Sequence, residues 1–536
     1  MLTIPDLLHH EPRLGIDREL VSELLEMAFL GKDSSEALDE ALGGADGEDP
    51  WRPGFFADDL FLRELVRSCF PVVVGGKTFT AHRAFLERVL ASPPRDLASV
   101  AFRQEIVREL DADPAIRAAF ESLYTSLYEL LDRLRLPGQV ARLDINTYRL
   151  EVLKHCKQVI DAMVDGFAGA SSGIRRLHEV GEEIRRSPEY RLLAHLVDYE
   201  DRLATIRVGV NVGASGRITG VAVDRIVENT DNIFYMRPLR RLRQRLSFLV
   251  RGYKWDSGSV LSRLVHQVFL RLTPSLTPMV QLLGHLEVYL ANRSFRDVAR
   301  RAGLDVCLAS FGDGGPIELV GLYNPLLLAG GGRPVPCSLP GRDPRSISLV
   351  TGPNSGGKTR LLQAVGLAQL LGQGGFYVAA ERADLQPVQG LFVSLIQQET
   401  ADQSEGRLGR ELVRIRTMFD GIRPPALVIL DELCSGTNPS EGIEVFSLVL
   451  RLLERLGPLA FISTHFLDYA RELADDPPVE GLEFLRVEVD ADQTSTYQFV
   501  PGVAETSLAA VMARRLGVTY EELAEVIDRR LGREAG

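Results

Sequence analysis

The spacing of hydrophobic residues divides the chain into a helical part and a part in which short strands alternate with helices. From about 98 to 200, apolar residues recur every three or four positions, which predicts long packed helices. Two alternating runs at 206–212 and 217–223 flank a small-residue turn and predict a β-hairpin. Helical spacing resumes from about 237 to 303, so the hairpin interrupts a helical region.

The pattern changes after a Gly/Pro-rich connector at 330–344, where short buried strands begin to alternate with helices. We therefore predict a mixed fold, with an N-terminal all-helical core that carries long lever helices and a small hairpin, and a C-terminal α/β domain. The predicted divisions are 1–95, a helical region without assigned chemistry; 96–310, the helical core and lever; 311–505, the α/β domain; and 506–536, a helical tail.

The first strand of the α/β part, 346–350, leads into a glycine-rich loop and then into an apolar helical pattern. Such glycines let backbone N–H groups surround phosphate oxygens, and the following helix N-terminus adds a favourable dipole. This is the order of a P-loop, which predicts ATP binding with Lys358 at the β- and γ-phosphates and Thr359 on Mg²⁺. The predicted nucleotide-binding residues are Gly352, Pro353, Asn354, Ser355, Gly356, Gly357, Lys358 and Thr359.

Two further strands bring acidic and basic groups to the same edge of the predicted sheet. Strand 426–430 ends in Asp431 and Glu432, and strand 459–464 ends before His465. Alone, the acidic pair could be a helix N-cap and the histidine an ordinary polar side chain. In this order they predict ATP hydrolysis, with Thr359 and Asp431 as Mg²⁺ ligands, Glu432 as the base that activates water, and His465 at the γ-phosphate.

Composition limits the remaining alternatives. The chain has 45% hydrophobic and 25% charged residues, as a folded globular protein does. Its five cysteines are scattered, which argues against a disulfide framework and against a zinc site. No apolar run has the length of a membrane span and no signal segment opens the chain, so we expect a cytoplasmic protein with no membrane partner. The net charge of −12 gives no general attraction to polyanions.

The runs 351–359, 427–437 and 463–465 together resemble the ATPase signature of the MutS family of DNA mismatch-repair and recombination ATPases, which belong to the ABC superfamily. Weaker similarity covers 101–110, which looks like the opening of the family's helical core, and the closing strand pair with the tail from 484 onward. The resemblance implies an ABC-like site shared between the two subunits of a homodimer. It also implies phosphate contacts for Asn354 and Gly357.

The chain departs from the family pattern in two places. Segment 404–411 lacks the family's Ser-Thr-Phe run, so the resemblance assigns no residue of 404–410 to ATP held by the partner subunit. Phe85-Leu86-Glu87 matches the Phe-x-Glu motif with which the family reads mismatches, but it lies in an apolar helical pattern typical of core packing. We therefore expect a short paralogue that lacks the mismatch-recognition domain.

Two segments bear on partners. Segment 237–254 contains basic residues and no acidic one, which predicts a contact with double-stranded or branched DNA. The basic residues are Arg237, Arg240, Arg241, Arg243, Arg245, Arg251 and Lys254. A solvated helix face, or pairing with the acidic remainder of the chain, explains the same residues, and the ATPase would then engage a protein partner, for example in a defence or signalling complex. In the tail, a capping box at 519–522 opens an apolar stripe that predicts either dimerisation or packing on the chain's own α/β domain.

Overall fold

The computed structural model describes residues 4–15, 17–43, 51–135, 145–201, 204–212, 218–228, 257–312, 314–353, 355–395, 407–434, 438–491, 494–505 and 517–531. The chain forms two compact units. The helical unit comprises Met1–Ala45 and Glu105–Tyr289, and the sheet unit comprises Asp46–Gln104 and Leu290–Gly536. This division differs from the predicted boundaries, because residues 51–95 belong with the sheet and not with the first helices.

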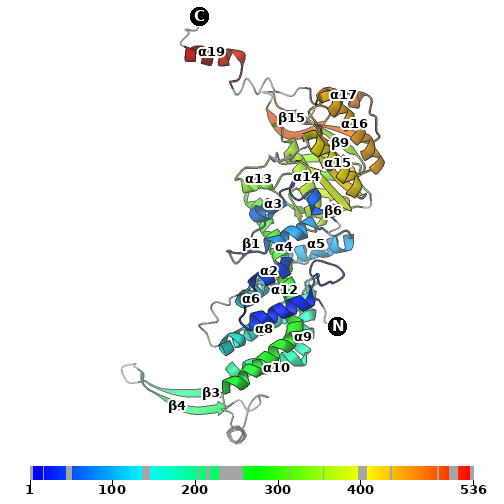
Figure 1. Cartoon of the computed structure of the whole chain (residues 1–536). Helices are drawn as coiled ribbons and strands as arrows, with labels where there is room; N and C mark the ends of the chain where they lie inside the picture. The colour runs from blue at the N-terminus through cyan, green and yellow to red at the C-terminus, as the bar shows by residue number, and fades with distance from the viewer. Residues whose placement is uncertain are drawn as a thin grey trace. The chain divides into compact units, whose positions relative to one another are not determined.

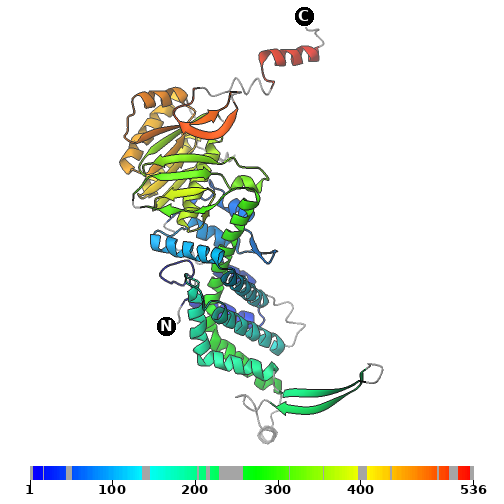
Figure 2. The same ribbon diagram turned by 180° about the vertical axis from the view of Figure 1, so that it is seen from behind.

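The helical unit is built from helices and one long hairpin (Figures 1 and 2). Its elements are α1 (Arg18–Phe29), α2 (Ser35–Gly43), the second half of α5 (Leu97–Ala112), α6 (Pro114–Leu134), α8 (Ile145–Gly166), α9 (Arg175–Arg186), α10 (Pro188–Asp201), β3 (Ala204–Val212), β4 (Ile218–Glu228) and most of α12 (Ser257–Arg301). The antiparallel β3–β4 pair is the predicted hairpin, with Val210 opposite Val221.

Helix α6 shows how apolar spacing and a capping residue form one of these helices. Phe120, Leu123 and Leu127 are fully buried and lie on one face of the helix, which packs against α8. Asp113 caps the start of α6, because its carboxylate accepts hydrogen bonds from the N–H groups of Ala115 and Ile116. The lever role of the long helices remains a prediction.

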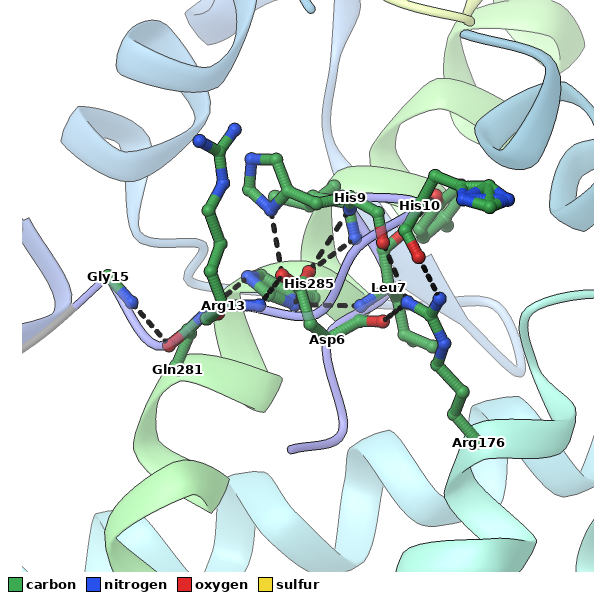
Figure 3. A network of polar contacts seen from close by, with 11 residues as sticks. Asp6, Leu7, His9, His10, Arg13, Gly15, Arg176, Gln281 and His285 are labelled. Atoms are coloured by element: carbon green, nitrogen blue, oxygen red, sulfur yellow. Dashed lines mark hydrogen bonds and ion pairs between the residues drawn. The ribbon is translucent and has the colours of Figure 1, made fainter. Parts of the chain in front are cut away.

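A buried carboxylate, Asp6, fastens the N-terminal segment within the helical unit (Figure 3). It accepts a hydrogen bond from the Leu8 N–H at 2.8 Å and contacts His9 Nδ1, also at 2.8 Å, with His285 of α12 nearby. Burial opposes ionisation, yet the His9 hydrogen bond and the two histidines hold the pKa of Asp6 well below its usual range. Arg176 donates to the Asp6 carbonyl oxygen, so α9 is joined to the same network.

The sheet unit contains the remaining elements, shown in Figure 1. They are η1 (Pro53–Phe55), α3 (Leu62–Cys69), β1 (Val72–Val74), β2 (Lys77–Phe79), α4 (Arg83–Ala91), β5 (Cys307–Leu308), β6 (Ser310–Phe311), β7 (Ile317–Leu322), α13 (Leu326–Ala329), β8 (Cys337–Arg342), β9 (Ile347–Thr351), α14 (Lys358–Gln373), β10 (Tyr377–Val378), β11 (Arg382–Leu385), β12 (Gly390–Ser394), α15 (Arg407–Gly421), β13 (Ala426–Leu430), α16 (Pro439–Leu456), β14 (Leu459–Ser463), α17 (Leu467–Asp475), β15 (Leu482–Val489), β16 (Ser495–Pro501) and α19 (Tyr520–Leu531).

Six strands form the main sheet in the order β12-β13-β14-β9-β15-β16. The first five run parallel, and β16 pairs antiparallel with β15, so the sheet is mixed. Residues of α15, α16 and α17 pack on one face of this sheet, and α14 with the smaller sheet of β6, β7, β8 and β11 lies against the other. Every residue of β9, β13 and β14 is therefore buried, which explains their continuous apolar sequences.

Residues 51–95 pack within the sheet unit and include a short hairpin, β1–β2, that the helical prediction for 1–95 missed. Asp59 joins this segment to the main sheet: it accepts a hydrogen bond from the Leu395 N–H at 2.9 Å and forms an ion pair with Arg414 of α15. Phe85 is buried, in agreement with the core-packing interpretation of Phe85-Leu86-Glu87.

None of the helices that the structure describes is both long and apolar enough to cross a membrane.

Candidate nucleotide-hydrolysis site

The loop between β9 and α14 has a backbone that only glycines can form at two positions. Gly352 and Gly357 have φ values of 142° and 87°. A Cβ atom on Gly352 would lie 2.6 Å from Cγ2 of Val487, and one on Gly356 would lie 2.9 Å from the carbonyl oxygen of Pro353. The loop is therefore packed tightly on β15, and a side chain at these positions would clash. Asn354 lies outside the described residues.

Lys358 is the first residue of α14, and its side chain returns across the loop. Its Nζ donates hydrogen bonds to the carbonyl oxygens of Gly352 at 2.8 Å and Pro353 at 3.1 Å. Burial lowers the pKa of Lys358, and the nearby carboxylates of Glu432 and Asp431 oppose that shift. The ammonium group is thus held within the loop, where the sequence predicted a phosphate contact.

Asp431 and Thr359 meet at the carboxyl edge of the sheet. Asp431 Oδ2 accepts a hydrogen bond from Thr359 Oγ1 at 2.6 Å, and Oδ1 accepts one from the Ser463 hydroxyl. Burial raises the pKa of Asp431, although both hydrogen bonds act in the opposite direction. A hydroxyl and a carboxylate side by side are oxygen ligands of the kind that Mg²⁺ prefers, so these two residues fit the predicted metal site.

Glu432 and His465 lie at the same edge. Parallel pairing sets Leu430 beside Ile462 and Ile462 beside Leu349, so the three strands β13, β14 and β9 end together. The Glu432 N–H donates to the Ser463 hydroxyl oxygen at 2.8 Å, and Glu432 has a left-handed φ of 50°. His465 follows β14 with an exposed side chain. Sequence reasoning gave Ser463 no role of its own, yet it fixes both acidic residues.

A pocket of about 480 Å³ adjoins the loop and was not predicted. Ser355, Gly357, Lys358 and Thr359 form one side of it, and Tyr323, Asn324, Val335 and Tyr497 are among the residues of the other. The Tyr497 ring is 3.1 Å from the position of a Cβ on Gly357, and the side chain is 45% exposed. The volume suits a nucleotide, and the aromatic ring offers a surface for a planar base.

The other predicted site residues cannot be placed. The seven basic residues of 237–254 and residues 404–406 all lie outside the described residues. Within α15, Glu411 Oε1 accepts a hydrogen bond from the Cys434 N–H at 2.7 Å. Helix α15, which begins directly after 404–406, is therefore connected to the loop that carries Asp431 and Glu432.

Comparison with known proteins finds a family model and curated relatives that are similar to this part of the chain. Residues 348–528 match the model of MutS domain V. Similar curated proteins are endonucleases MutS2: that of Thermus thermophilus is 28% identical over 337 residues, covering 61% of this chain and 43% of the relative. The Streptococcus uberis protein is 26% identical over 424 residues, which cover 73% of this chain and 53% of the relative. The Gemmatimonas aurantiaca protein is 32% identical over 261 residues, which cover 48% of this chain and 32% of the relative.

The chain spans about half, or less, of the length of these relatives. The family match begins within β9 and extends into α19, so it contains the glycine-rich loop, the Asp431–Glu432 pair and His465. These matches confirm the resemblance to the MutS family, and residues 348–528 of this chain are similar to MutS domain V.

Proposed function

We propose that this chain is an ATP-dependent DNA-binding protein of MutS type that acts on DNA repair or recombination intermediates, with ATP hydrolysis gating a homodimer. One observation carries the ATPase part of the proposal: the hydrogen-bonded Thr359–Asp431 pair, with Glu432 beside it, lies at the sheet edge where the glycine-rich loop holds Lys358. The DNA part rests on the similarity to endonucleases MutS2 and on the basic segment at 237–254.

Each residue of the site has its own role in the hydrolysis of ATP. The loop N–H groups and Lys358 bind the phosphates, while Thr359 and Asp431 hold Mg²⁺, which neutralises phosphate charge when bound. Glu432 accepts a proton from the attacking water. At the same time the water oxygen bonds to the γ-phosphorus, and the bond between the γ-phosphorus and the bridging oxygen of the β-phosphate breaks. His465 contacts the γ-phosphate, and the products are ADP and phosphate.

The tail helix α19 supports the homodimer. Its apolar residues Leu523, Val526 and Ile527 are 43%, 46% and 55% exposed, so they do not form a core in the described part of the chain. Thr519 starts the helix as predicted, because its Oγ1 accepts a hydrogen bond from the Glu522 N–H at 3.3 Å. An amphipathic helix with an uncovered apolar face is suited to pairing with a second copy of itself.

Introducing charge on this face should break the dimer. With Val526→Glu and Ile527→Glu together, we expect light scattering to give the monomer mass at concentrations where the wild type is dimeric, because two carboxylates would be buried in an apolar interface. Glu525→Gln on the same helix serves as the control and should leave the dimer intact. A double variant that stays fully dimeric would remove the tail from the interface.

The basic segment at 237–254 is proposed as the DNA contact outside the ATPase domain. It carries seven cationic residues without an acidic one, in a chain of net charge −12, and the aromatic residues Tyr235, Phe248, Tyr253 and Trp255 lie in or beside it. Cationic groups bind phosphates, and aromatic rings stack on exposed bases.

Charge reversal within the segment should weaken binding of every DNA substrate to a similar degree. For Arg241→Glu with Arg245→Glu, we expect the slope of log affinity against log salt to flatten by roughly two, because about two fewer counterions are released. Fluorescence anisotropy over a salt series measures both effects. Arg451→Glu with Arg455→Glu, on exposed positions of α16, is the matched control. Unchanged DNA affinity and salt slope in the first variant would exclude this segment.

A second function, ATP-dependent engagement of a protein partner through the helical unit, is favoured by the acidic net charge. The two functions differ in one measurable property, since only the first makes ATP turnover respond to added DNA.

A further inference from the structure

A second large pocket of the sheet unit lies at the edge of the main sheet opposite the glycine-rich loop. Its volume is about 570 Å³, and it lies between residues 51–55, Arg95, the start of β12 at 389–391 and the end of α15 at 421–423. Because β12, β13, β14 and β9 run parallel, the start of β12 and the end of β9 lie at opposite edges. A five-residue strand separates those edges by roughly 15 Å. A ligand here would be distinct from ATP on the glycine-rich loop.

The lining of this pocket is cationic and aromatic. Among the residues that the structure describes, it includes the guanidinium groups of Arg52, Arg95 and Arg423 and no carboxylate. Within the part of the chain that the structure describes, no carboxylate pairs with Arg52 or Arg423. In a chain of net charge −12, three arginines around one hollow form a local region of opposite sign.

Four of the lining side chains are also held in place before any ligand arrives. The Trp51 indole donates a hydrogen bond to the Pro93 carbonyl oxygen at 2.7 Å, and Arg95 donates one to the Gln389 carbonyl oxygen at 3.3 Å. The Arg52 guanidinium lies 5.7 Å from the centre of the Phe55 ring. A Cβ on Gly421 would lie 2.7 Å from Cζ of Phe55, so a glycine at this position lets the ring approach α15. Preorganisation of this kind lowers the entropy cost of binding.

We propose that this pocket binds a phosphate ester about the size of one nucleotide, with the phosphate on the arginines and a planar group against Phe55. Guanidinium groups form paired, charge-assisted hydrogen bonds with phosphate oxygens and also stack on planar rings. The volume lies within the usual range of small-molecule sites. A free mononucleotide and the phosphorylated end of a DNA strand share this chemistry. The proposed pocket does not depend on the proposed ATPase site or on the basic segment at 237–254.

The first arm of the test is calorimetric titration of the full chain with AMP. In Arg95→Gln and Arg423→Gln, both at exposed positions, we expect affinity to fall roughly tenfold or more, because each loses charge-assisted hydrogen bonds. Lys358→Ala and the matched surface variant Arg451→Gln should bind AMP as the wild type does. Thermal melting of each variant verifies that it is folded. AMP binding that is lost with Lys358→Ala but retained in both pocket variants would overturn this arm, since AMP would then occupy the glycine-rich loop.

The second arm uses one short single-stranded oligonucleotide with either a 5′-phosphate or a 5′-hydroxyl. Tighter binding of the phosphorylated form in the wild type, abolished in Arg423→Gln and kept in Arg451→Gln, identifies a strand end as the source of the phosphate. AMP binding with no preference for the 5′-phosphate identifies a free nucleotide. If AMP does not bind at millimolar concentration and the 5′-phosphate makes no difference, or if the pocket variants change neither, the proposal is wrong.

Discussion

Glu432→Gln should bind ATP about as tightly as the wild type and hydrolyse it about 10²–10⁴ times more slowly. The substitution removes the group that accepts the proton from water while preserving the side-chain shape. It leaves Lys358, Thr359 and Asp431 in place, so the contacts to phosphate and metal remain. The backbone N–H of Glu432, which donates to Ser463 at 2.8 Å, is unaffected as well. Fluorescent-nucleotide binding and steady-state phosphate release measure the two effects separately.

Glu444→Gln, at an exposed position on α16, is the matched control and should retain full turnover. It makes the same chemical change in the same unit, away from the sheet edge. Wild-type ATP hydrolysis by Glu432→Gln would show that another group is the general base. Loss of ATP binding in that variant would assign Glu432 to binding instead.

Lys358→Ala should weaken ATP binding itself, by roughly tenfold to a hundredfold, the worth of one hydrogen-bonding charge on a phosphate. Its ammonium group is held over the loop by the carbonyl oxygens of Gly352 and Pro353 at 2.8 and 3.1 Å. The variant therefore loses both the phosphate contact and a support of the loop. Equilibrium binding of ATP at fixed Mg²⁺ gives the loss directly.

Because Lys358 also supports the loop, its variant needs a control for folding. We expect Lys358→Ala to show a cooperative thermal transition and Arg455→Ala, at an exposed position on α16, to bind ATP normally. Lys358→Arg keeps the charge with a different shape and should bind ATP less tightly than the wild type. Wild-type affinity in a folded Lys358→Ala would contradict the assignment of the phosphate contact.

The strands around the site could be predicted because their signal is local. β9, β13 and β14 are buried on both faces, which produces continuous apolar runs, and the structure places their ends within one residue of the predicted bounds. The glycines of the loop are also local, since the backbone there needs positive φ at Gly352 and Gly357. The meeting of Asp431 with Thr359 followed from the parallel order of the strands.

The pocket beside the loop could not be predicted, because it joins segments that are far apart in the sequence and carry no motif. Tyr497 lies on β16, and Asn324, which donates a hydrogen bond to Gln363 Oε1 at 3.0 Å, lies between β7 and α13. The packing of 51–95 on the sheet was missed for the same reason. A buried Asp59 paired with Arg414 looks in the sequence like any exposed acidic residue.

The rate of ATP hydrolysis, measured with and without DNA, tests the central claim most directly. A panel of duplex, branched and single-stranded DNAs should be titrated at low salt, with Glu432→Gln as the inactive control. Our account predicts Mg²⁺-dependent turnover in the wild type, a rate that changes when duplex or branched DNA is added, and no comparable turnover in the control. An ATP hydrolysis rate that no DNA changes, or equal rates in the wild type and Glu432→Gln, would contradict this account.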